Sequence, residues 1–166
     1  MQRLFAFLSL IGFTLSLCVH VCALLGIDAA TKIPHHGYLH LGIFVVFIPF
    51  VFLSRKVFGP TPTQEKVFAH FPRWVIVLGY VLIAYTIINF LLFMIATEGG
   101  GPAMRDGKYI LESHGRFIRE ITASEYLAFQ ANVARGFSGH WILFYFIPLA
   151  FFAFRKPAPP ATSAQN

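Results

Sequence analysis

Residues 74–96 read WVIVLGYVLIAYTIINFLLFMIA, a run that contains no acidic side chain. A transmembrane α-helix needs about 20 mostly apolar residues, because each residue adds about 1.5 Å and the hydrocarbon core is about 30 Å thick. This run reaches that length. Polar side chains within a span seek a partner, so four are expected to face other helices: Tyr80, Tyr85, Thr86 and Asn89. The run predicts a membrane-spanning helix and decides the class of the fold.

Three further apolar runs extend the prediction to four spans, at about residues 4–27, 36–54, 74–96 and 137–154. The first follows Arg3 as a signal peptide would, but its apolar part exceeds the roughly 7–15 residues of a cleavable signal. The second is short unless it is extended to both ends, and the alternative is a segment that crosses half the bilayer. Pro49 predicts a kink in it. We therefore expect an all-α integral membrane protein with a four-helix transmembrane bundle.

The composition agrees with this class, since 57% of the 166 residues are hydrophobic and only 12% are charged. Average soluble domains are about 45–50% apolar and about 25% charged. The net charge of +6 does not indicate nucleic-acid binding, because the basic residues are scattered through connecting segments and form no stripe with interleaved aromatic residues. The expected partner of the apolar surface is the lipid bilayer, with no nucleic acid.

The basic residues instead predict the orientation, because cytoplasmic loops carry an excess of Lys and Arg. Segment 54–73 holds four of them, whereas segment 28–37 holds only Lys32. Arg3 and the Arg155-Lys156 pair flank the two ends. Both termini are therefore predicted in the cytoplasm, with a disordered tail at 157–166. The small size and the lack of sorting motifs suggest a bacterial inner membrane.

Segment 97–136 is then an extracytoplasmic insertion between the third and fourth spans. After a flexible stretch at 98–102, residues 108–121 read KYILESHGRFIREI, which predicts a β-hairpin that turns at His114-Gly115. Thr122 and Glu125 have the spacing of a capping box, which predicts a helix start.

The helix that follows is predicted to be amphipathic and to end or bend at Gly136. It could lie on the outer membrane face or pack on the hairpin. Alternatively, it could form a surface that docks a partner.

The second and fourth spans resemble each other. Both begin with a histidine, at His40 and His140, and both continue through Phe-Ile-Pro to Arg-Lys. A duplicated helical hairpin would relate the two halves by a pseudo-two-fold axis along the membrane normal, with these histidines as symmetry mates. The alternative is chance similarity between two phenylalanine-rich spans.

The histidines are the candidate ligands, because the predicted orientation places most of them near the outer side. His20 lies deepest, and an ionisable group within a span is a functional candidate. His36 and His40 have the i, i+4 spacing that allows two imidazoles to bind one transition metal ion. His20, His40 and His140, from three spans, could together hold a cofactor such as haem b. The alternative is that these histidines are amphipathic residues at the membrane interface.

No enzyme motif accompanies these histidines: the sequence has no phosphate-binding loop, nucleophile elbow, HExxH or paired carboxylates within a span. The leading hypothesis is a non-catalytic accessory or subunit protein whose insertion docks a membrane-protein partner or a second copy in a homo-oligomer. The rival is a haem- or metal-binding redox protein. Residues 135–141, RGFSGHW, form a distinctive string with no mechanism attached.

Overall fold

The computed structural model describes residues 1–27 and 35–156, and in that part the chain is mostly helical. The helices are α1 (Gln2–Leu24), α3 (Tyr38–Phe58), α4 (Gln64–Phe68), α5 (Arg73–Ala96) and α6 (Ala123–Leu149), which continues as the π-helix η1 (Ala150–Phe154). The strands are β1 (Gly101–Arg105), β2 (Lys108–Ser113) and β3 (Arg116–Glu120). Within these described residues, four helices are long and apolar enough to cross a membrane, namely α1, α3, α5 and α6 with η1. The predicted tail at 157–166 lies outside the described residues.

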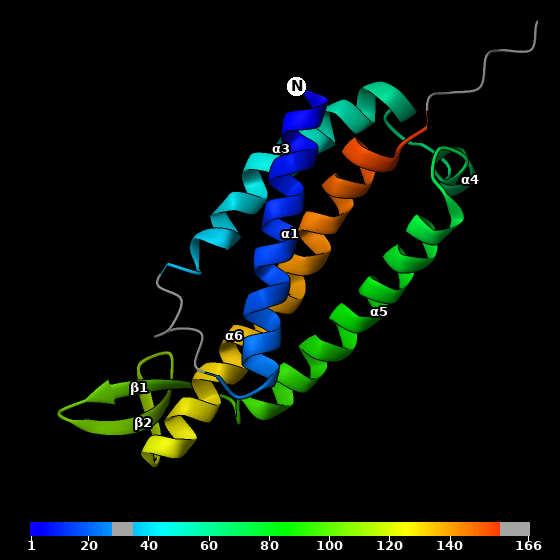
Figure 1. Cartoon of the computed structure of the whole chain (residues 1–166). Coiled ribbons are helices and arrows are strands. Elements are labelled where there is room, and N and C mark those ends of the chain that lie inside the picture. The colour runs from blue at the N-terminus through cyan, green and yellow to red at the C-terminus, as the bar shows by residue number, and fades with distance from the viewer. Residues whose placement is uncertain (28–34, 157–166) are drawn as a thin grey trace, which may run out of the picture.

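Helix α6 is the centre of the fold. It packs against α1, α3 and α5, and Figure 1 shows it running between them from the sheet at one end to η1 at the other. More than half of its most apolar stretch is buried (56%), against 11% for α5. Its neighbours therefore have apolar faces that no other described helix covers.

The packing does not support the duplicated hairpin. A pseudo-two-fold axis would make α3 contact α5 as extensively as α1 contacts α6. The contact between α1 and α6 is the largest between any two elements described, whereas α3 and α5 contact each other little, if at all. His40 and His140 consequently do not occupy equivalent positions.

Small residues allow α1 to lie close to α6. Ser9, Gly12 and Ser16 are buried along one side of α1, and small side chains at a helix interface let two backbones approach. A Cβ atom on Gly12 would lie 2.1 Å from the ring of Tyr145 on α6. The Tyr145 hydroxyl also donates a hydrogen bond of 2.7 Å to the Leu39 carbonyl on α3. This one aromatic ring therefore joins α6 to both α1 and α3.

The three strands form an antiparallel sheet in the order β1-β2-β3. The hairpin of β2 and β3 is confirmed, including the turn at His114-Gly115, where both residues have positive φ. The flexible stretch predicted at 98–102 is wrong in its last two residues, because β1 begins at Gly101. Asp106 and Gly107, again with positive φ, join β1 to β2. An Asp-Gly pair between two strands is a strong hairpin signal, and it could have predicted β1 as a partner of β2.

The amphipathic helix of the insertion and the fourth span are one continuous helix. The capping box of Thr122 and Glu125 is confirmed at its start, but Gly136 neither ends nor bends it into two elements. A Cβ atom on Gly136 would lie 2.5 Å from the Phe93 ring of α5. This glycine therefore serves close packing between helices. The hydrogen-bonding pattern changes to that of a π-helix only after Pro148, which has no N–H to donate.

Candidate functional site

The insertion is attached firmly to the first turns of α6. Leu111 on β2, which is fully buried, packs with Ile121 and Phe129 in a small hydrophobic core, and two tyrosines close its edge. The rings of Tyr109 and Tyr126 lie 4.7 Å apart. Because Phe129 and Tyr126 belong to α6, the sheet and this helix form one unit.

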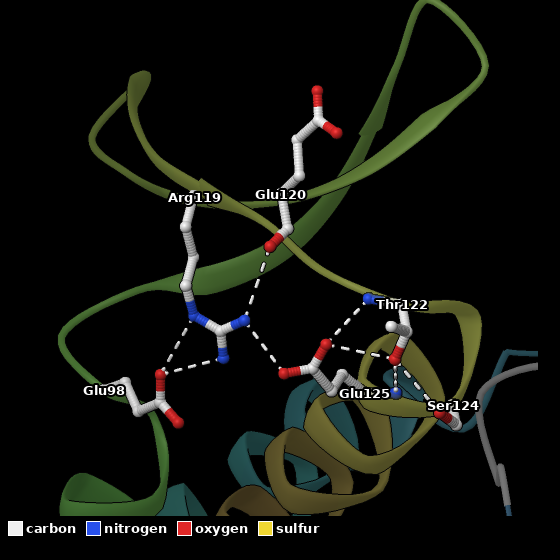
Figure 2. Close-up of polar contacts among 6 residues, drawn as sticks. All are labelled: Glu98, Arg119, Glu120, Thr122, Ser124 and Glu125. Atoms are coloured by element: carbon white, nitrogen blue, oxygen red, sulfur yellow. Dashed lines mark hydrogen bonds and ion pairs between the residues drawn. The ribbon is translucent and has the colours of Figure 1, made fainter.

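Arg119 on β3 adds polar links to the same junction (Figure 2). Its guanidinium contacts Glu98 at 3.0 Å and Glu125 at 2.8 Å. Glu98 follows α5 and Glu125 lies in the first turn of α6. The arginine therefore connects the strand to both helices that flank the insertion.

Glu125 makes this junction sensitive to acid. The backbone N–H of Thr122 donates to its carboxylate, and Arg119 and the Thr122 hydroxyl add further bonds that lower the pKa of Glu125 below 4.5. A carboxyl whose pKa is lowered by folding stabilises the folded state above its unfolded pKa, and loses this contribution as the pH falls through its folded pKa. We therefore expect hydrogen exchange in the first turn of α6 to accelerate below about pH 4.5, after the measured rates are corrected for the pH dependence of intrinsic amide exchange. Glu125→Gln should exchange faster at neutral pH and show little further acceleration, and unchanged exchange in this variant would contradict the assignment.

The face of the sheet that includes Ile110 carries an ordered set of side chains. Ile110 is only 5% exposed and lies between two ion pairs, Arg105 with Glu112 and Lys108 with Glu120, each 2.6 Å long. Phe117, paired with Glu112 across the strands, is 60% exposed. Aromatic side chains are enriched in protein–protein interfaces. This face is the candidate docking site.

His20, the deepest predicted ligand, lies in a polar cluster buried between three helices. Its Nδ1 is 2.8 Å from the hydroxyl of Ser138 on α6, and its Nε2 is hydrogen-bonded to the hydroxyl of Tyr85 on α5. Ser138 donates its own hydrogen to the Ala134 carbonyl at 2.6 Å. Ser138 can then only accept from Nδ1–H, and the Nε2 atom of a neutral His20 accepts from Tyr85. Both ring nitrogens are satisfied within the protein.

Two neighbouring side chains of α5 extend this cluster. Thr86 donates to the Gly139 carbonyl and Asn89 donates to the Arg135 carbonyl, at 3.4 and 3.2 Å. A Cβ atom on Gly139 would lie 2.2 Å from the Asn89 amide nitrogen. The prediction that polar residues of this span face other helices is confirmed for these two and for Tyr85. Tyr80 is 53% exposed, and its ring contacts Phe68 of α4, with centroids 6.0 Å apart, and not one of the other three long helices described.

The structure does not gather His20, His40 and His140 around one point. Trp141 donates to His40 Nδ1 at 3.1 Å, and His140 Nδ1 is 2.7 Å from the Gly136 carbonyl of its own helix. No group of three His, Cys, Asp or Glu side chains that could hold a metal ion occurs in residues 1–27 and 35–156. Haem or metal binding by these histidines stays a prediction.

His36 and His40 do come together, although not as two positions of one helix. His36 precedes α3, which begins at Tyr38, so the assumed helical spacing does not apply. Both rings lie near Trp141, with centroids 6.3 and 6.4 Å from it, and both line a cavity of about 230 Å³. The pair therefore packs around the tryptophan, and metal binding by it stays a prediction.

Residues of the RGFSGHW string at 135–141 contact α1, α3 and α5. Ser138 bonds to α1, Trp141 bonds to α3, and Gly136 and Gly139 admit side chains of α5. The sequence pattern singled out this string but did not reveal its role, because a local pattern contains no information about which distant helices it contacts. No family model, no curated protein and no solved structure matches this chain.

Proposed function

We propose that this chain is an integral membrane protein with four spans, both termini in the cytoplasm of a bacterial cell and the sheet outside the inner membrane. The support is the length and hydropathy of the four helices together with their exposed apolar faces. On α5, for example, Val77, Ile87 and Leu91 are all exposed. Water would make such faces costly at about 25 cal/mol per Å², whereas lipid covers them.

The orientation has a direct test with two reporter fusions. Alkaline phosphatase inserted in the turn at 106–107 should be active, because it would fold outside the inner membrane. The same reporter after residue 166 should be inactive, and a green fluorescent protein there should fluoresce. The opposite pattern would overturn the orientation, and extraction of the chain by alkaline carbonate would overturn the membrane location.

We further propose that the chain is a non-catalytic accessory subunit that docks a membrane-protein partner through its insertion. The observation that carries this proposal is the rigid attachment of a sheet whose Ile110 face presents an exposed aromatic ring. A surface held in one conformation loses little entropy on binding, which favours recognition. The His20 cluster is consistent with a structural role, since its side chains satisfy one another.

Site-specific crosslinking tests this docking surface. A photoreactive phenylalanine analogue at Phe117 should form a defined adduct in native membranes, whereas the same analogue at Thr61, an exposed residue at the other end of the molecule, should form none. The charge reversal Lys108→Glu, on the same face of the sheet as Phe117, should reduce the yield without unfolding the protein. An adduct of twice the chain mass would identify a homo-oligomer. No adduct, or equal adducts at both positions, would contradict the proposal.

The rival function as a haem- or metal-binding redox protein is tested by the visible spectrum and metal content of the purified protein. Because both ring nitrogens of His20 have partners within the chain, and no group of three potential metal ligands occurs in residues 1–27 and 35–156, we expect no Soret band and no stoichiometric metal. A Soret band, or bound metal, that is lost in His140→Ala would overturn the accessory role. His114→Ala, in the exposed turn, is the matched control.

A further inference from the structure

A cavity of about 460 Å³ lies between α3 and α5 and is lined by residues of α4. Figure 1 shows α4 at the end of the molecule opposite the sheet. Its floor is formed by α6 and η1, including Phe146 and Phe151, and α4 closes its end through Val67 and Phe68. It exists because α3 and α5 both pack on α6 but contact each other little. Its volume falls in the range of ligand sites, about 300–1,000 Å³. We name it the α3–α5 cavity.

The walls of this cavity are almost entirely apolar, and it opens sideways between the helices. Tyr80 and Ile83 on its α5 wall are both exposed at the surface. Gly79 lines the cavity on α5 and has no side chain to fill it. A Cβ atom there would lie 3.6 Å from the Phe146 ring, which is an ordinary van der Waals contact. If the chain spans a membrane as proposed, this opening faces the lipid acyl chains. An acyl chain is the natural occupant of such an opening.

Two basic side chains contact residues that line the same cavity, at the end predicted to be cytoplasmic. Lys66 Nζ donates to the carbonyl of the wall residue Phe58 at 2.8 Å, and the Arg155 guanidinium lies 4.8 Å from the centre of the Phe151 ring. The flanking segments 54–73 and 150–156 hold six basic residues and one acidic residue: Arg55, Lys56, Lys66, Arg73, Arg155 and Lys156, against Glu65.

None of these six cations forms an ion pair within residues 1–27 and 35–156. The four ion pairs found there all lie in and beside the insertion. The end of the molecule that carries the cavity is therefore left with uncompensated positive charge. An anionic group at this level of the membrane would provide the compensation.

We propose that the α3–α5 cavity binds an anionic phospholipid, with an acyl chain in the cavity and the phosphate among Lys66, Arg155 and their basic neighbours. Basic sites between helices on the cytoplasmic side are suited to such headgroups. The apolar volume favours a lipid over a free phosphate ion, which would need the cations but not the cavity. The inference rests on the membrane location proposed above and is independent of partner docking.

Native mass spectrometry of the purified chain tests the site, with phosphatidylglycerol and phosphatidylcholine of identical acyl chains as probes. The wild type should retain phosphatidylglycerol in preference. The double variant Lys66→Gln/Arg155→Gln should bind it about tenfold more weakly or worse, without a change for phosphatidylcholine. Lys108→Gln, which removes one charge from the sheet, should leave retention unchanged. Equal retention of the two lipids by the wild type would overturn the proposal.

The acyl-chain part has its own variant, Gly79→Leu, which fills the cavity and leaves every charge in place. It should weaken phosphatidylglycerol binding, whereas Ala84→Leu, exposed on the same helix, should not. If Gly79→Leu differs from the wild type in size-exclusion chromatography or in its melting temperature, Ile83→Trp at the opening is used instead. Wild-type lipid binding by the folded filled variant, or displacement of the lipid by inorganic phosphate alone, would overturn the proposal. If the analogue at Phe117 forms no adduct but the chain still prefers phosphatidylglycerol, the result contradicts partner docking and leaves the lipid site supported.

Discussion

Gly12→Leu is expected to lower the free energy of unfolding in detergent by about 3 kcal/mol, because it forces extra atoms into a packed interface. The leucine side chain would occupy the place of the Tyr145 ring. Movement of that ring into the neighbouring cavity of about 490 Å³ would break the hydrogen bond of its hydroxyl to the Leu39 carbonyl. Far-ultraviolet circular dichroism during denaturation measures the change.

The matched control is Gly79→Leu, the same substitution on α5. A Cβ atom there meets one ring atom at 3.6 Å, and the α3–α5 cavity has room for the remainder. Its free energy of unfolding should stay within about 1 kcal/mol of the wild type. Equal losses at the two positions would show that a leucine is poorly tolerated for reasons other than the contact with Tyr145.

Tyr85→Phe is expected to cost about 1–3 kcal/mol of folding free energy, because it leaves the Nε2 atom of His20 without a partner. His20 is 2% exposed, so water does not readily replace the lost hydroxyl. Tyr80→Phe is the matched control on the same helix, since that side chain is exposed, and it should change stability by less than about 0.5 kcal/mol.

A double variant sharpens this prediction. Tyr85→Phe combined with His20→Leu removes both partners of the hydrogen bond, and an apolar pair of similar shape avoids the unsatisfied group. Its loss of stability should be smaller than the sum of the two single losses, as measured in a double-mutant cycle. Strict additivity would show that the two side chains do not interact.

Much of the secondary structure could be predicted from local features. Apolar run length located the four long helices, because the length needed to cross a bilayer is a property of the segment alone. The capping box at Thr122 was equally local, since its two partners are three residues apart. Strand β1 could also have been predicted from the Asp106-Gly107 turn that follows it. The glycine-rich stretch at 98–102, which includes the start of β1, instead favoured a flexible segment.

The candidate site was predicted less completely. The depth of His20 in an apolar run made it a functional candidate but did not indicate its partners, Tyr85 and Ser138, which lie 65 and 118 residues away. The hypothesis that His20, His40 and His140 together hold a cofactor was based on their predicted location near the outer side of the membrane. Depth specifies one coordinate only, and the positions of the helices around α6 supply the other two.

The sequence by itself determined the number of long apolar helices, the turn of the second hairpin and the start of α6, because each depends on residues close together in the chain. Only the tertiary structure decided that α6 occupies the centre and that Gly12, Gly136 and Gly139 admit the side chains of its neighbours. It also decided that α3 and α5 leave a cavity between them. The reason is that contacts between apolar helices depend on the shapes of both surfaces, and an apolar face contains no local signal that names its partner.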